Sequence, residues 1–182
     1  YSHDKAIISQ EGNNAIVGYD KGRFEMSGSL SAKWQPVKRL GLSLVLREEI
    51  IGEQLSPIIP AFFIDGVLFE PANIMLKASV SRNFRAPTLN DLYTLPGGNP
   101  ELRNERGWTY DAGMSFAIGR DKIYSLRGSV SWFESFIHDW ILWLPTTQGF
   151  FSPRNIKDVH AYGIEAQGNL VLHLPKDWTI DL

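Results

Sequence analysis

The sequence predicts an all-β chain folded as an antiparallel meander with unusually long strands. Apolar and polar residues alternate over several segments of about 10 to 13 residues, which is the period of a pleated strand. The links between these segments alternate between short and long. Aromatic residues lie near the predicted strand ends. These three observations favour part of a transmembrane β-barrel.

The clearest alternation begins at Phe24 and continues to Gln35, with apolar residues at the even positions and polar residues at most odd positions. The same period recurs in residues 40–46, 74–85, 108–118, 124–132 and 162–172. In each segment, one set of side chains points to one face of the sheet and the other set to the opposite face. We expect a further strand pair around residues 6–9 and 15–19.

Residues 56–71 allow two interpretations. Asp65 and Gly66 lie between two apolar runs and could form a tight hairpin turn. The directions of the flanking strands instead require a single strand here, with its turn near residues 70–73. We prefer the second interpretation and expect Gly66 to be a β-bulge.

The links divide into two classes by length. Short links are predicted at residues 36–39, 119–122 and 175–177, and long links at 51–56, 86–105 and 145–154. Outer-membrane barrels have short turns at one end and long loops at the other. Trp34 and Trp178 flank short turns, whereas Trp108, Tyr110 and Trp132 lie toward the long loops, as in two aromatic girdles. A soluble antiparallel sheet with one wet face remains the alternative.

Composition excludes several other classes of protein. The 182 residues contain no cysteine, so disulfides and thiolate metal sites are excluded. A net charge of −2 gives no basic surface for nucleic acid. No run approaches the roughly 20 apolar residues of a membrane helix. The chain opens without Met or a signal-like segment, so we expect a piece of a longer protein whose targeting signal lies upstream.

Three segments resemble the barrel of TonB-dependent outer-membrane receptors. They are Ser-Arg-Asn-Phe-Arg-Ala-Pro-Thr-Leu-Asn-Asp-Leu-Tyr at residues 81–93, Gly-Gly-Asn-Pro-Glu-Leu-Arg-Asn-Glu at 97–105, and Asn155 ahead of a strand that holds Gly-Ile-Glu at 163–165. The resemblance implies a 22-stranded barrel in the cell outer membrane, with an N-terminal plug in its lumen and TonB as the source of energy. Residues 1–182 would then supply eight or nine strands, and the plug and TonB box would lie outside them.

The resemblance also implies partners: outer-membrane lipid, the plug domain, TonB, and a scarce nutrient such as a ferric siderophore or cobalamin. The alternative is a soluble all-β ligand-binding or structural module with no transport role. No enzyme is expected, because the sequence has no Gly-x-Ser-x-Gly motif and its four histidines share no ligand spacing. Haem receptors of this family carry a ligating His after the Phe-Arg-Ala-Pro box. Residues 86–99 hold none, so we expect no haem or other cofactor.

The long link at residues 86–105 and its rim hold the candidate substrate contacts, which are Arg85, Tyr93, Arg103 and Arg106. Guanidinium groups suit anionic chelates. The alternative is that these arginines and Arg82 pair with Asp91, Glu101 and Glu105 and brace the loop.

We expect this link to be ordered rather than flexible, because Pro87, Pro96 and Pro100 restrict its backbone and Gly97-Gly98 supply a tight turn. Leu89, Leu92, Tyr93 and Leu95 give it an apolar side. We therefore expect it to pack on the extracellular rim or mouth of the barrel, with Leu92 and Tyr93 inward and Arg103 beside an acidic partner.

Overall fold

The computed structural model describes residues 2–11, 14–120, 123–174 and 178–182 and is almost entirely β-structure. Its strands are β1 (Ser2–Glu11), β2 (Asn14–Arg23), β3 (Glu25–Val37), β4 (Leu40–Ile51), β5 (Gln54–Leu55), β6 (Ile59–Phe69), β7 (Ile74–Arg85), β8 (Glu105–Arg120), β9 (Tyr124–Pro145), β10 (Phe151–Leu174) and β11 (Trp178–Asp181). The helical segments are the 3-10 turn η1 (Glu70–Ala72) and the helix α1 (Leu89–Tyr93). No helix among the described residues has the length and apolar character to cross a membrane.

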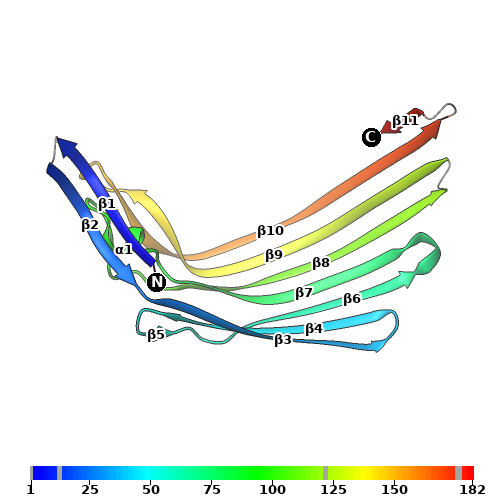
Figure 1. Cartoon of the computed structure of the whole chain (residues 1–182), viewed down its shortest axis with the longest axis horizontal. Coiled ribbons are helices and arrows are strands. Elements are labelled where there is room, and N and C mark those ends of the chain that lie inside the picture. The colour runs from blue at the N-terminus through cyan, green and yellow to red at the C-terminus, as the bar shows by residue number, and fades with distance from the viewer. Residues whose placement is uncertain (1, 12–13, 121–122, 175–177) are drawn as a thin grey trace.

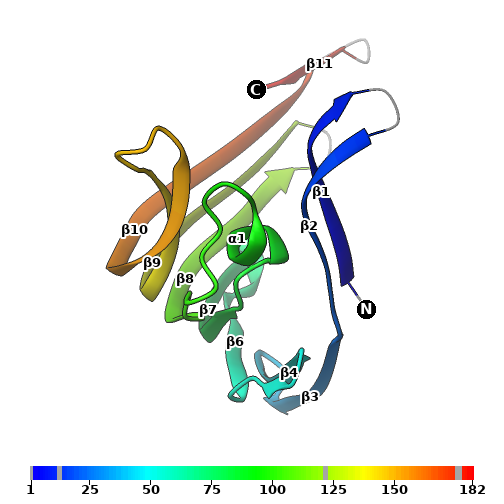
Figure 2. The same ribbon diagram turned by 90° about the vertical axis from the view of Figure 1, so that its left-hand side faces the viewer.

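The main sheet is a meander, as the sequence predicts. Its order is β11-β10-β9-β8-β7-β6-β4-β3, and β5 pairs with β4. The predicted pair near the N-terminus forms a separate two-stranded sheet, β1-β2. Seen from the end where the long loops lie, the main sheet is an open arc, with α1 on its inner side and the β1-β2 hairpin across the opening (Figure 2). The described strands outnumber the eight or nine expected, and two of them, β5 and β11, are only two and four residues long.

Residues 59–69 form one strand, which excludes a hairpin at Asp65-Gly66. The turn follows at η1, and Asn73 has a left-handed backbone with φ 44°. The prediction of a bulge at Gly66 was wrong, since Gly66 pairs regularly with Leu40 and Leu76. The register shifts instead between Val67 and Phe69. Gly66 is the last residue of β6 with a regular β4 partner, and the shift lies in the pairing with β7, next to the turn at η1.

The register places apolar side chains of neighbouring strands on one face, which we call the apolar face. One row across it consists of Trp34, Leu42, Ile64, Ala78, Ala112, Trp132 and Ile164. The opposite face, the polar face, carries hydrogen-bonded side chains. Ser79 Oγ donates to Asp111 Oδ2 (3.0 Å), and Asn83 Nδ2 donates to Thr109 Oγ1 (2.7 Å). The sheet is therefore two-faced, as the alternation predicts.

The sheet does not bury its apolar face within this chain. Leu30, Trp34 and Ile164 are 70%, 67% and 73% exposed. The buried hydrophobic residues of the described chain are Ile59, Leu89 and Ile141, which lie toward the long-loop end. A soluble protein rarely leaves so extensive an apolar surface in water. This face therefore needs an apolar environment that the chain itself does not supply.

Three strands are longer than the 10 to 13 residues expected, because β8 has 16 residues, β9 has 22 and β10 has 24 (Figure 1). The link expected at 145–154 consequently shrinks to residues 146–150. Asn155 lies inside β10, opposite Ile141, and not ahead of the strand. The alternation could not reveal this extension because residues 140–144 are apolar at every position. Such a run is typical of a strand covered on both faces.

Candidate functional site

The segment from residue 86 to 104, the 86–104 loop, begins where Pro87 prevents further strand pairing after Arg85. Its helix α1 starts with a capping box. The Thr88 backbone N–H donates to Asp91 Oδ2 (3.0 Å), and the Asp91 N–H donates to Thr88 Oγ1 (3.1 Å). This reciprocal pair satisfies two backbone donors that a helix start leaves free. The loop is therefore ordered, as predicted.

Two buried carboxylates, Asp91 of the loop and Glu105 at the start of β8, accept hydrogen bonds from β9. Trp143 Nε1 donates to Asp91 Oδ1 (2.9 Å), and the Ile141 backbone N–H donates to Glu105 Oε1 (2.9 Å). Asp91 is 4% exposed and Glu105 is 6% exposed. Carboxylates so deeply buried need such partners. Glu105 points to the polar face of β8 together with Thr109, whereas the next residue, Arg106, has the opposite parity. The loop lies on the inner side of the arc (Figure 2).

Arg85 joins both carboxylates. Its Nη1 lies 2.7 Å from Glu105 Oε1, and its Nη2 lies 3.6 Å from Asp91 Oδ2. This geometry agrees with the bracing role considered for the arginines. The Arg85 side chain is 48% exposed, so part of the guanidinium still faces the solvent.

Arg103 lies beside an acidic partner, as predicted, but the partner is Asp139. Its Nε and Nη2 contact Asp139 Oδ1 at 3.0 and 2.6 Å, and Arg106 Nη2 approaches Oδ2 at 3.9 Å. Asp139 has φ 59°, a left-handed conformation that aspartate adopts more readily than most residues. Sequence reasoning missed Asp139 because it lies 36 positions beyond Arg103 in a strand that the alternation did not define.

The Asn155 side chain connects the backbones of Arg103 and Asp139. Its Oδ1 accepts from the Arg103 N–H (2.8 Å), and its Nδ2 donates to the carbonyls of Arg103 (3.0 Å) and Asp139 (2.6 Å). Asn99 makes a second connection to β10, since its Nδ2 donates to the Pro153 carbonyl (3.2 Å). The loop is thus fastened to β9 and β10 along its length.

The β1-β2 hairpin lies against α1 on the other side. Arg23 Nη1 donates to the Pro87 carbonyl (2.7 Å), and Lys21 Nζ lies 5.5 Å from the Tyr93 ring centroid. Burial raises the pKa of the Tyr19 phenol, and the charges of Asp4 and Asp91 raise it further. The Arg23 and Lys21 contacts thus place β2 beside the loop.

The candidate contacts come together only in part. Arg103 and Arg106 share Asp139, although Arg106 has the strand parity of Trp108 on the apolar face. Arg85 instead pairs with Asp91 and Glu105, and Tyr93 lies near Lys21. Leu92 and Tyr93 are half-buried, which agrees with the inward orientation expected. Leu95 was wrongly included in the apolar side, because it lies in the turn after α1 and is 59% exposed.

The described residues contain no cluster of three or more metal-ligating side chains. His160 Nε2 lies 2.8 Å from Glu134 Oε1, and His138 pairs with Asp158. Both histidines thus form separate pairs with carboxylates across β9 and β10. The cations and aromatic rings around the 86–104 loop suit non-covalent binding.

Replacement of Gly97 by alanine should loosen the loop. Gly97 has φ 116°, and a Cβ there would lie 2.2 Å from the Phe151 carbonyl oxygen. The backbone conformation alone costs about 1–3 kcal/mol for a residue with a side chain. Gly149→Ala is the matched control, because Gly149 has φ 86° but nothing within 4 Å of its Cβ position. We expect faster proteolytic cleavage of the loop in Gly97→Ala than in Gly149→Ala, and equal rates would contradict the close contact.

Comparison with known proteins agrees with this architecture. Residues 6–182 match the family described as TonB dependent receptor-like, beta-barrel. The chain belongs to the TonB-dependent receptor family. The resemblance found in the sequence is thereby confirmed, as is the antiparallel barrel class, and the complete barrel's 22 strands stay a prediction.

Two similar proteins match about half of this receptor chain. It is 34% identical over 91 residues to the vitamin B12 transporter BtuB of Vibrio vulnificus, covering 50% of the chain and 14% of that protein. It is 31% identical over 98 residues to the vitamin B12 transporter BtuB of Photobacterium profundum, covering 52% of the chain and 15% of that protein. The receptor chain therefore spans a small part of these relatives.

A solved structure supports the fold of the receptor chain. The copper transporter OprC superposes with a TM-score of 0.65 over 87% of the chain and 27% of its own length, at 14% identity. At this identity the likeness concerns the fold alone.

Proposed function

We propose that this chain is part of the barrel of an outer-membrane receptor that imports a scarce nutrient, with an N-terminal plug and TonB supplied by other parts of the system. The family match over residues 6–182 is the observation that carries the proposal. The exposed apolar face supports it, because lipid would cover Leu30, Trp34 and Ile164. A soluble binding or structural module would leave that face in water.

The strand lengths suit this setting. Tyr124 begins β9, and Glu134 follows ten positions later as the first charged residue on its apolar face. Ten residues rise about 33 Å along a strand, which at the usual barrel tilt spans an apolar band of about 25 Å. The rest of β9 and the outer half of β10 would then extend above the membrane. The 86–104 loop would lie at the mouth on the lumen side.

In this position the loop would contact the nutrient. We propose Arg85, Tyr93, Arg103 and Arg106 as substrate contacts, with the cations binding anionic groups and the Tyr93 ring stacking on apolar ones. The Arg103 side chain is 70% exposed although it pairs with Asp139, so it stays accessible. Cobalamin is the first nutrient to test, because the similar BtuB proteins are vitamin B12 transporters. A ferric siderophore is the second.

Uptake measurements test this proposal. In a strain that lacks other receptors for the nutrient, the full-length receptor should restore uptake of labelled cobalamin or of a ferric siderophore. Arg103→Ala or Tyr93→Ala should lower initial uptake by about tenfold at low nutrient concentration, the loss of one good contact. Lys38→Ala is the control, since Lys38 is exposed in the β3-β4 turn at the opposite end. Absence of the receptor from the outer membrane, or uptake of neither nutrient, would contradict the proposal.

A further inference from the structure

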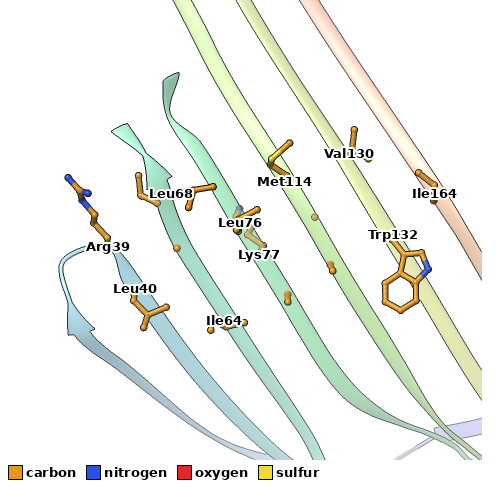
Figure 3. Close-up of a pocket in the computed structure, with 15 residues that line it drawn as sticks. Arg39, Leu40, Ile64, Leu68, Leu76, Lys77, Met114, Val130, Trp132 and Ile164 are labelled. Atoms are coloured by element: carbon orange, nitrogen blue, oxygen red, sulfur yellow. The ribbon is translucent and has the colours of Figure 1, made fainter. Parts of the chain in front are cut away.

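A groove of about 770 Å³ crosses the apolar face over β6, β7, β8 and β9 (Figure 3). The register explains the hollow. In one row Ala78 and Ala112 lie between Ile64 and Trp132, so two small side chains separate two large ones. In the next row Gly66 lies between Leu40 and Leu76. The volume lies within the roughly 300–1,000 Å³ of ligand pockets.

The lining is apolar apart from one end. Its larger side chains are Leu40, Ile64, Leu68, Leu76, Met114, Val130, Trp132 and Ile164. Lys77 borders the groove between Leu76 and Ala78, and the pleat directs its side chain to the polar face. The Trp132 indole N–H is the one conventional side-chain hydrogen-bond donor among these larger side chains. The apolar part suits a hydrocarbon chain.

Arg39 provides the charged end, in the short turn between β3 and β4. Its Nε and Nη2 both contact Glu70 Oε1 at 2.8 Å. The two side chains are 59% and 62% exposed, so water weakens their attraction. A guanidinium has five donors, and contact with one carboxylate oxygen leaves others for a second anion. Phosphate oxygens are well suited to them.

We propose that this groove binds one phospholipid of the outer membrane, with an acyl chain in the apolar part and the headgroup phosphate on Arg39. The inference rests on the proposed function, because the face must lie in that membrane to meet such a lipid. Short turns of these barrels face the periplasm. The phosphate at Arg39 thus belongs to a lipid of the periplasmic leaflet. Apolar lining along the strands and a cation at headgroup level together match a phospholipid.

The test uses the full-length receptor in mild detergent, with dioleoyl phosphatidylglycerol titrated in and counted by native mass spectrometry. We expect one tightly retained lipid. The double variant Ala78→Leu with Ala112→Leu fills the hollow and should weaken this binding at least about tenfold. Ala166→Leu is the control, since Ala166 lies on the same face, opposite Val130, but outside the groove lining. Heat-modifiable migration on gels would check that each variant is folded.

The headgroup contact is tested separately. Arg39→Gln should weaken phosphatidylglycerol binding by about tenfold but leave binding of uncharged dioleoylglycerol unchanged. Equal lipid retention by wild type and the filled double variant would overturn the inference, as would a bound protein in place of lipid. A receptor that imports its nutrient but retains no lipid would refute this inference alone. A receptor absent from the outer membrane would refute the proposed function.

Discussion

Asp91→Ala in the full-length receptor is expected to release the 86–104 loop from the barrel, at a cost of about 3 kcal/mol. The change removes the acceptor for the Thr88 N–H and hydroxyl, which is the side-chain half of the capping box at α1. It also leaves the Trp143 indole N–H without its acceptor in a partly buried position. The Arg85 contact at 3.6 Å adds little, because that side chain is 48% exposed.

Hydrogen exchange of the amides in residues 88–99 would measure this effect. A loss of about 3 kcal/mol corresponds to exchange roughly 100-fold faster, since each 1.4 kcal/mol is a factor of ten. Asp91→Asn keeps a side-chain acceptor and should have a smaller effect. Asn90→Ala is the neighbouring control, because Asn90 is exposed. Unchanged exchange in Asp91→Ala, or equal acceleration in Asn90→Ala, would show that the buried carboxylate does not hold the loop.

Val130→Arg is expected to destabilise the complete barrel by about 2–4 kcal/mol, the cost of an arginine facing lipid near the bilayer midplane. Val130 pairs with Met114 and Ala166 on the apolar face, six positions beyond the start of β9. Ser129→Arg should cost much less, because Ser129 pairs with Ser115 and Gln167 on the polar face. The two positions are adjacent in one strand, so their side chains point to opposite faces of the sheet at nearly the same depth in the membrane.

Urea unfolding of the receptor in phospholipid vesicles would compare the two variants. The same contrast is expected for Arg in place of the apolar-face residues Leu42, Leu44 and Leu170 against the polar-face residues Ser29 and Gln167. Equal destabilisation by the two sets would mean that the apolar face does not meet lipid. The groove proposal would then fail as well.

The contacts of the 86–104 loop also bear on nutrient entry. Bonds to β9 and β10 hold it on one side, and Arg23 of β2 holds it on the other. The loop is therefore built as a fixed wall of the proposed mouth rather than a free lid. Selection by such a wall would rest on the side chains it presents, which is why Tyr93 and Arg103 are the informative variants.

The sequence by itself determined the class of fold, the two faces and most strand positions. Period-two alternation is a local property, since neighbouring side chains of a strand point to opposite faces whatever else surrounds them. Residues 24–35 and 108–118 therefore revealed strands without any tertiary information. The Phe-Arg-Ala-Pro box at residues 84–87 likewise indicated the family and the strand end at Arg85. The direction argument placed the turn after β6 correctly, although the bulge lay beyond Gly66.

Only the tertiary structure decided how the loop is held and how far β9 and β10 extend. Asp139 and Asn155 meet Arg103 because two strands, β9 and β10, converge with the loop, at separations of 36 and 52 residues that no local pattern records. Residues 140–144 do not alternate between apolar and polar, because the 86–104 loop supplies a partner for Trp143 on the inner face. That face is therefore covered by the loop here rather than exposed to water. The groove likewise depends on register, since Ala78 and Ala112 become neighbours only when β7 pairs with β8. Local periodicity determines which face a side chain joins, whereas pairing across strands determines which side chains it meets there.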